Sequence, residues 1–263
     1  MGRHLLECSG NSNRHRFGLL SVAEWSGVPL EELFEENMGN FSRSMLFLVT
    51  GNDEHPEERR GSVRGASWVF TYDQIERAGA FLATHMNGEL LPLDHGAPVR
   101  LVMPGWYGCS CIKWVESIEG VSAEHPSTSQ MIEFSGRTHQ DGEPELARDF
   151  APAEIDFAAM PILVEGPDPR GSFAVTGVAW GNPAGVSSLL VGIRDVARQD
   201  DPDSVSWRAV DGFEPPEPSS WFLWQHRFTP PRPSEYEITL RVGEPDVRTR
   251  RLDSGYYARR VRV

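Results

Sequence analysis

One stretch decides how the first half of this chain is interpreted: Met86-Asn-Gly-Glu-Leu-Leu-Pro-Leu-Asp-His-Gly-Ala-Pro-Val-Arg100, or MNGELLPLDHGAPVR. Asn87-Gly88 is a strong tight-turn signal and predicts an ordered segment on either side. The glycine and proline between His95 and Arg100 fix the backbone there, so a turn plus a short strand would aim both side chains at one anion. For either residue alone, a hairpin with incidental polar side chains is the simpler interpretation.

The only lysine of the chain follows at position 113, although the sequence contains 25 basic residues. Lysine presents a compact point charge and arginine a planar fork, so the two are not interchangeable where an oxyanion is bound. A single lysine among arginines therefore favours a specific role for Lys113.

Cys8 lies in a dense motif, His4-Leu-Leu-Glu-Cys-Ser-Gly-Asn11. An isolated cysteine beside small residues is most often structural. Small residues after a thiol, however, let a bulky ligand approach the backbone, and a thiolate suits transition metals. Three cysteines in 263 residues exclude a disulfide scaffold. A bond between Cys109 and Cys111 would be strained, which favours free thiols or a ligand.

Composition limits the class of protein. The chain has 263 residues, 39% of them hydrophobic, with eight Trp and thirteen Phe, which predicts a sizeable core in one large domain or two ordinary ones. The formal net charge of −13 argues against a general nucleic-acid binder. The apolar run Met45–Val49 is far too short to span a membrane, and no signal segment opens the chain.

The first half is expected to mix helices and strands. A capping-box pattern at Ser21–Glu24 predicts a short helix, and a second such pattern at Thr71–Gln74 predicts a helix reaching about Ala83. Pro29 suits the first turn of a helix over Leu30–Phe34. Strands are expected at Arg3–Cys8, Met45–Thr50 and Arg100–Met103, with a surface loop at Asn52–Arg64.

The second half is expected to be all β. Glu119–Pro152 has little periodicity and is interpreted as an irregular connection. Short β-rich runs separated by Pro- and Gly-rich turns then predict a β-sandwich of immunoglobulin-like type. The runs are Ser172–Trp180, Ser188–Arg194, Val205–Val210, Trp221–Phe228 and Glu235–Val242.

Several motifs, taken in order, resemble the sulfite oxidase family of molybdopterin enzymes over roughly residues 4–115. After 155 the chain is similar to the immunoglobulin-like dimerisation domain of that family. The motifs are Glu7-Cys-x-Gly-Asn11, Trp25-x-Gly-Val-x-Leu30, Met86-Asn-Gly-Glu-x-x-Pro-x-x-His-Gly-x-Pro-x-Arg100, Pro104-Gly-x-x-Gly-x-x-x-x-Lys-Trp114, Val175-x-Gly-x-Ala-Trp180 and Tyr236-x-Ile238.

The resemblance implies an α+β fold in two domains. A mixed α/β molybdopterin domain would occupy residues 1–150 and an immunoglobulin-like β-sandwich residues 155–263. The family fold needs a leading segment before the cysteine motif, so the first domain is expected to be N-terminally incomplete. Any export signal would lie in that segment, which leaves the bacterial periplasm and the cytoplasm both open.

The resemblance also implies a molybdenum cofactor site. Cys8 would be the protein thiolate on molybdenum, beside two sulfurs from the pterin dithiolene. The cofactor's pterin and phosphate, which need hydrogen-bond partners and cations, would contact Asp53, His95, Arg100, Cys111, Ile112 and Lys113.

The substrate pocket departs from the family pattern. The position of a pocket arginine is taken by Asn13, with Arg14 next to it, and the position of a pocket tyrosine by Phe134, which has no hydroxyl. Arg251 is the candidate for a third substrate arginine near the chain end. Cys8, Arg14 and Arg251 are therefore the predicted catalytic residues.

The implied function is oxidation of sulfite, or a similar small oxyanion, by oxo transfer at molybdenum. No haem motif occurs in the sequence, so electrons would pass to an external redox protein such as a cytochrome. A homodimer is expected, without nucleic acid or a membrane span. Two alternatives stay open: a catalytically silent truncated chain that acts only through its dimerisation sandwich, and a reductive relative acting on nitrate or S-oxides.

Overall fold

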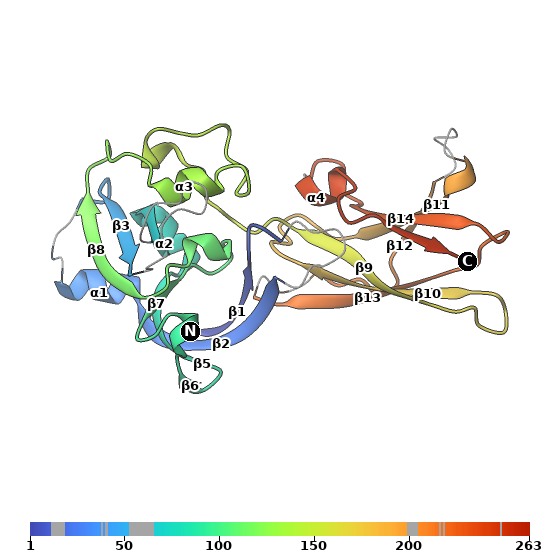
Figure 1. Cartoon of the computed structure of the whole chain (residues 1–263), viewed down its shortest axis with the longest axis horizontal. Helices are drawn as coiled ribbons and strands as arrows, with labels where there is room; N and C mark the ends of the chain where they lie inside the picture. Colours follow the sequence, from blue (N-terminus) through green and yellow to red (C-terminus); the bar gives the residue numbers. More distant parts are fainter. Residues whose placement is uncertain are drawn as a thin grey trace. The chain divides into compact units, whose positions relative to one another are not determined.

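The computed structural model describes residues 1–11, 19–37, 39, 42–52, 66–198, 205–215, 217, 219–247 and 249–263. These residues form two compact units (Figure 1), the first ending at Ile155 and the second running from Asp156 to Val263. Within these ranges fifteen strands accompany four short α-helices. The fold is therefore mostly β, with fewer helices than the mixed α/β expectation for the first half.

The first unit contains a five-stranded antiparallel sheet. Strand β2 (Leu20–Pro29) lies between β1 (Gly2–Glu7) and β5 (Phe81–Met86), and β5 also pairs with β6 (Glu89–Leu90) and β7 (Arg100–Val102). The strands expected near Arg3 and Arg100 are confirmed. The helix expected at Ser21–Glu24 is wrong, because this segment pairs with β1 on one side and the rest of β2 with β5 on the other. Tertiary pairing here outweighs the local capping signal.

A second sheet in the first unit has the order β4 (Ala66–Thr71), β3 (Leu46–Gly51), β8 (Val115–Val121). It shares one hydrophobic core with the helices α1 (Leu30–Asn37), α2 (Tyr72–Ala78) and α3 (Ser129–Phe134). Phe34 of α1 stacks on Phe47 of β3 with ring centroids 4.3 Å apart. The helix after Pro29 and the strand over Met45–Thr50 are thereby confirmed.

Helix α2 shows where local signals succeed and where they stop. Thr71 and Gln74 form the predicted capping box, each side chain bonding the backbone N–H of the other. The helix ends at Gly79, which adopts the left-handed conformation with φ of 61°. The expected extension to Ala83 is wrong, since Phe81 begins strand β5. The loop expected at 52–64 lies, after Asn52, outside the described residues.

The second unit consists of two antiparallel sheets around a shared core. One has the order β13 (Trp221–Phe228), β10 (Phe173–Trp180), β9 (Ala158–Glu165); the other has the order β12 (Ser206–Ala209), β11 (Leu189–Asp195), β14 (Glu235–Val242), β15 (Arg259–Arg262). Val175 and Trp224 from the first sheet share the core with Leu189, Val191 and Ile238 from the second. All five strands expected in this half are present. That the unit is immunoglobulin-like stays a prediction.

Shorter elements complete both units. The segment expected to be irregular, 119–152, holds the end of β8, helix α3 and the 3₁₀ turn Ala147–Asp149. Helix α4 (Arg250–Asp253) belongs to the second unit. Across the described ranges, no α-helix combines the length and the apolar composition that crossing a bilayer requires.

Candidate functional site

Cys8 directly follows strand β1. Its backbone N–H donates to the Leu19 carbonyl at 3.0 Å, and its own carbonyl accepts from the Asn11 N–H at 2.8 Å, so a tight turn holds the residue. The side chain is exposed, and the Gly10 N–H donates to Sγ at 3.4 Å. The turn therefore presents a thiol that a ligand can reach.

A cation approaches the same glycine as this sulfur. Gly10 has no side chain, and a Cβ there would stand 3.6 Å from the Cys8 Sγ and 3.5 Å from Nη1 of Arg137. The Arg137 guanidinium packs over the Phe134 ring, 5.4 Å from its centroid. Sequence reasoning did not select Arg137. The available signal was its place three residues after Phe134, in the segment assigned to the substrate pocket.

The other two cysteines have a different character. Burial, with a smaller contribution from the neighbouring Cys111 and Cys8 thiols, raises the pKa of Cys109 to about 12, although a hydrogen bond with Ser9 opposes this. Burial also raises the pKa of Cys111, whose Sγ accepts from the Met103 N–H at 3.4 Å. All three thiols are free. Cys109 and Cys111 thus remain protonated at neutral pH, which leaves Cys8 as the thiol suited to a metal.

Arg100, at the start of β7, is a buried cation with an exposed fraction of 5%. It donates from Nη1 to the His95 carbonyl at 3.2 Å and from Nη2 to the Cys111 carbonyl at 3.3 Å. Its guanidinium packs over the Trp25 ring at 5.3 Å, and its buried Nε has no hydrogen-bond partner among the described residues. Burial lowers the pKa of Arg100. No carboxylate pairs with it among the described residues, and a buried charge without a counter-ion is costly, so the position favours an anionic ligand.

Two further predicted residues surround this cation. The 3₁₀ turn Leu93–His95 is closed by Gly96, whose φ is 107°. A Cβ on Gly96 would stand 2.9 Å from the Lys113 Cβ and 3.1 Å from the Arg100 Cβ, so the three backbones pack closely. Lys113 donates from Nζ to the Asp94 carbonyl at 2.6 Å. The fold therefore brings His95, Arg100 and Lys113 together.

The remaining predicted cofactor contacts, Cys111 and Ile112, do not expose their side chains. Cys111 and Ile112 bury their side chains in the core of the first unit, at 3% and 1% exposure. Cys111 offers only its backbone carbonyl, which Arg100 already uses. Any contact of this pair with a cofactor would run through the backbone, and their role stays a prediction.

For three residues of the sequence analysis, the described part of the first unit gives no position. Arg14 and Asp53 lie outside the described residues. Arg251 belongs to helix α4 of the second unit, where it is buried and donates from Nη1 to the Tyr257 hydroxyl at 3.1 Å. A catalytic role for Arg14 or Arg251 stays a prediction.

Comparison with known proteins agrees with these features. Residues 3–129 match the family model described as oxidoreductase molybdopterin binding domain. Mitochondrial sulfite oxidase of Macaca fascicularis is 27% identical over 241 residues, covering 84% of this chain and 42% of that protein. NADPH nitrate reductase of Phytophthora infestans is 30% identical over 137 residues, covering 48% and 14%. This chain thus spans less than half the length of these two relatives.

A solved structure supports the fold. The sulfane dehydrogenase SoxCD of Paracoccus pantotrophus aligns with a TM-score of 0.58 at 18% identity, covering 90% of this chain and 59% of that one. At this identity the likeness concerns the fold alone.

The residues present fit the molybdenum cofactor. The metal needs a thiolate that it can reach, and Cys8 is exposed. The anionic end of the cofactor needs a cation, and Arg100 is buried with Nε unpartnered. No group of three or more His, Cys, Asp or Glu side chains in the described ranges could hold a metal ion by itself. A metal here would therefore depend on Cys8 and on ligands that the cofactor brings.

Proposed function

We propose that this chain is the core of a molybdenum-dependent oxidoreductase that oxidises sulfite or a similar small oxyanion, because residues 3–129 match the family model described as oxidoreductase molybdopterin binding domain. The resemblance to sulfite oxidases and the molybdenum cofactor agree with the matches. The observation that supports the substrate class is that the Arg137 guanidinium and the exposed Cys8 thiol both approach Gly10.

The chain's own residues hold the cofactor in this proposal. Cys8 ligates the metal as a thiolate. Arg100 binds the cofactor phosphate, using the Nε–H that has no partner among the described residues. His95 and Lys113 flank Arg100 and contact the pterin and its phosphate. When bound, the cofactor supplies a metal that exchanges an oxygen atom and two electrons with the substrate.

Arg137 positions the substrate. Its guanidinium offers several N–H donors in one plane, which match the oxygens of sulfite, and it neutralises the charge of the anion next to the metal ligand. The Phe134 ring beneath it limits how the guanidinium can turn. Water supplies the oxygen that converts sulfite to sulfate. This step releases two protons to solvent and passes two electrons to an external acceptor such as a cytochrome.

We further propose that the second unit is an immunoglobulin-like dimerisation domain.

Metal analysis of the purified chain, expressed in a host that makes the cofactor, tests this proposal. We expect about one molybdenum per chain, lost in Cys8→Ser and retained in Cys109→Ser. The latter is the matched control, because the Cys109 thiol is protonated at neutral pH. Absence of molybdenum from the wild-type chain would favour the catalytically silent alternative.

Activity assays then separate the directions of reaction. We expect sulfite to reduce an artificial electron acceptor in the presence of the loaded chain. The match to a nitrate reductase motivates the alternative assay, in which nitrate oxidises a reduced dye. Turnover in the second assay alone would replace sulfite oxidation by a reductive function.

A further inference from the structure

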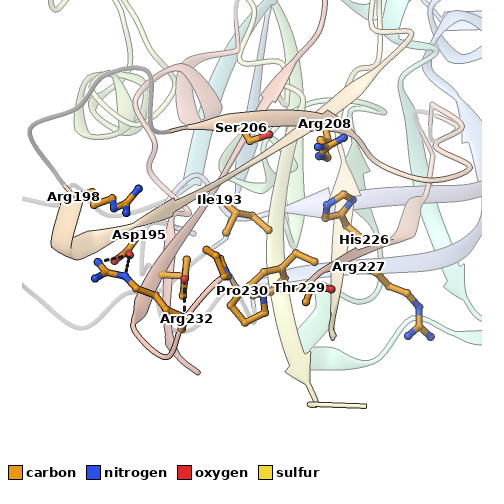
Figure 2. Close-up of a pocket in the computed structure, with 13 residues that line it drawn as sticks. Ile193, Asp195, Arg198, Ser206, Arg208, His226, Arg227, Thr229, Pro230 and Arg232 are labelled. Atoms are coloured by element: carbon orange, nitrogen blue, oxygen red, sulfur yellow. Dashed lines mark hydrogen bonds and ion pairs between the residues drawn. The ribbon is translucent and has the colours of Figure 1, made fainter. Parts of the chain in front are cut away.

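The second unit contains a pocket that the proposed function does not use. Its volume is about 740 Å³, within the range of roughly 300–1,000 Å³ that small-molecule sites occupy. Figure 2 shows side chains from β11, β12 and β13 converging on it. Strands β12 and β13 are edge strands of different sheets, so both layers of the unit contribute to the walls.

His226, on β13, is the first sign that the pocket binds something. The residue has an exposed fraction of 7%, and its buried Nδ1 has no hydrogen-bond partner in the part of the chain that the structure describes. Buried polar atoms in native proteins are nearly always hydrogen-bonded, so such an atom indicates a missing ligand or water. Burial lowers the pKa of His226; Asp211 opposes this and Arg208 adds to it. The ring is therefore neutral at neutral pH and carries one N–H donor.

The charges around the pocket are unbalanced. Arg208, which lies opposite His226 in Figure 2, and Arg198 make no ion pair or hydrogen bond with the described part of the chain. The other charged side chains are occupied: Arg232 donates to Asp195 from Nε at 2.8 Å, and Arg227 lies 3.6 Å from Asp168. Asp195 also accepts from Ser234 and from the Ala197 N–H. Two cations without a partner among the described residues thus face a pocket whose lining carboxylate already has partners.

Most of the remaining lining is apolar, and Ser206 and Thr229 add hydroxyl groups to it. Ile193, Phe228 and Pro230 contribute to the walls, and Figure 2 shows Ile193 and Pro230 between the Arg208 end and the Arg198 end. An inorganic ion alone would leave these surfaces wet, whereas a ligand with an apolar body covers them. We propose that this pocket binds a small organic anion, a sulfonate or carboxylate on an apolar body, with Arg208 and His226 holding the anionic group.

Titration calorimetry of the full chain with 2-naphthalenesulfonate tests the proposal. We expect binding of this probe, at least tenfold weaker binding of the uncharged 2-naphthalenesulfonamide, and no displacement by equimolar inorganic sulfate. Arg208→Ala should weaken the probe about tenfold or more, because it removes a charged donor. Arg170→Ala is the matched control, an exposed arginine of the same unit outside the pocket lining. It should leave binding unchanged.

A second measurement keeps the proposal testable if the His226 variant does not fold. His226→Phe keeps an aromatic ring in the core but removes both nitrogens. If that variant does not fold, the imidazole nitrogen resonances of His226 in the wild-type chain should still shift with the probe. Equal binding of the sulfonamide, unchanged binding by Arg208→Ala, or no probe binding at millimolar concentration would each overturn the proposal. Because the probe titration needs no molybdenum, its outcome is independent of the oxidoreductase function.

Discussion

Arg100 and Arg43 show how differently two guanidinium groups of one chain are used. Arg43 lies on the surface and pairs with Glu76 at 3.3 Å, an arrangement that contributes about 0–1 kcal/mol. Arg100 is buried, bonds two carbonyls and has no carboxylate partner among the described residues. A buried guanidinium with no carboxylate partner is best explained by an anionic ligand that supplies the counter-charge.

Replacing Arg100 by lysine should therefore abolish binding of the cofactor. Lysine keeps the charge but cannot donate to both carbonyls and to an anion in one plane. We expect Arg100→Lys to lower bound molybdenum at least tenfold, measured by elemental analysis of purified chain. Arg43→Lys is the control and should keep the wild-type content. Equal metal content in both variants would contradict the assignment.

Arg137 allows a prediction about the substrate. Arg137→Ala should raise the KM for sulfite about tenfold to a hundredfold, the size expected for one lost charged hydrogen bond, with a smaller change in kcat. Arg137→Lys should recover part of the loss. Arg148→Ala, which removes an exposed arginine near Glu124, should change neither constant. A fall in molybdenum content in Arg137→Ala would instead indicate a role in holding the cofactor.

At the scale of elements, the outcome of each prediction depended on how local its cause is. The capping box of α2 and the Asn87-Gly88 turn are set by neighbouring residues, and both were predictable. Strand β2 was mistaken for a helix because its pairing partners are distant in sequence. Strand β9 was missed, and Pro161 within it is atypical of a strand.

The same rule explains the site. His95 and Arg100 lie in one motif and Lys113 in the next along the chain, so the resemblance predicted that the three side chains would meet. The place of Arg137 near Cys8 was not predictable, because the two residues are far apart in the sequence and no motif connects them. Only the turn at Gly10 and the end of α3 place the two together.

Gly27 makes the strand arrangement testable. The β2–β5 register shifts between Ser26 and Gly27, and a Cβ on Gly27 would stand 1.9 Å from the Leu82 carbonyl oxygen. Backbone cannot move aside cheaply, so Gly27→Ala should destabilise the first unit by about 2–3 kcal/mol. Urea unfolding measures this. Gly136→Ala, where nothing lies within 4 Å of the added Cβ, should change stability by less than about 0.5 kcal/mol.

For the whole molecule, pH acts through buried groups. Burial lowers the pKa of His226 below its ordinary 6.5, so the unfolded chain binds a proton more readily. The hydrogen bond from Ser234, with Arg232 assisting, holds the pKa of Asp195 below its ordinary 3.8, although burial opposes this. His226 therefore favours the folded state above about pH 6.5, and Asp195 favours it above about pH 4.

Stability should accordingly fall in two steps as the solution is acidified. The first loss begins below about pH 6.5 and the second near pH 4, as the solution passes through the lowered pKa of each group. Urea midpoints measured between pH 8 and pH 3 check this. His226→Phe should remove the contribution of His226 to the first loss of stability. The contribution of His4 should remain, because burial lowers the pKa of His4 as well. Asp195→Asn should reduce the second step. An unchanged profile in both variants would contradict the account.

The contrast among the three cysteines has a practical consequence. Cys8 faces solvent, while the other two thiols are protonated at neutral pH, with Cys109 half-buried and Cys111 buried. A mild alkylating agent should thus modify Cys8 alone, so that the native chain can be labelled at one residue without mutating the other cysteines. Since the metal would claim that same sulfur, the fraction of chains that escape alkylation becomes a direct count of how many carry the cofactor.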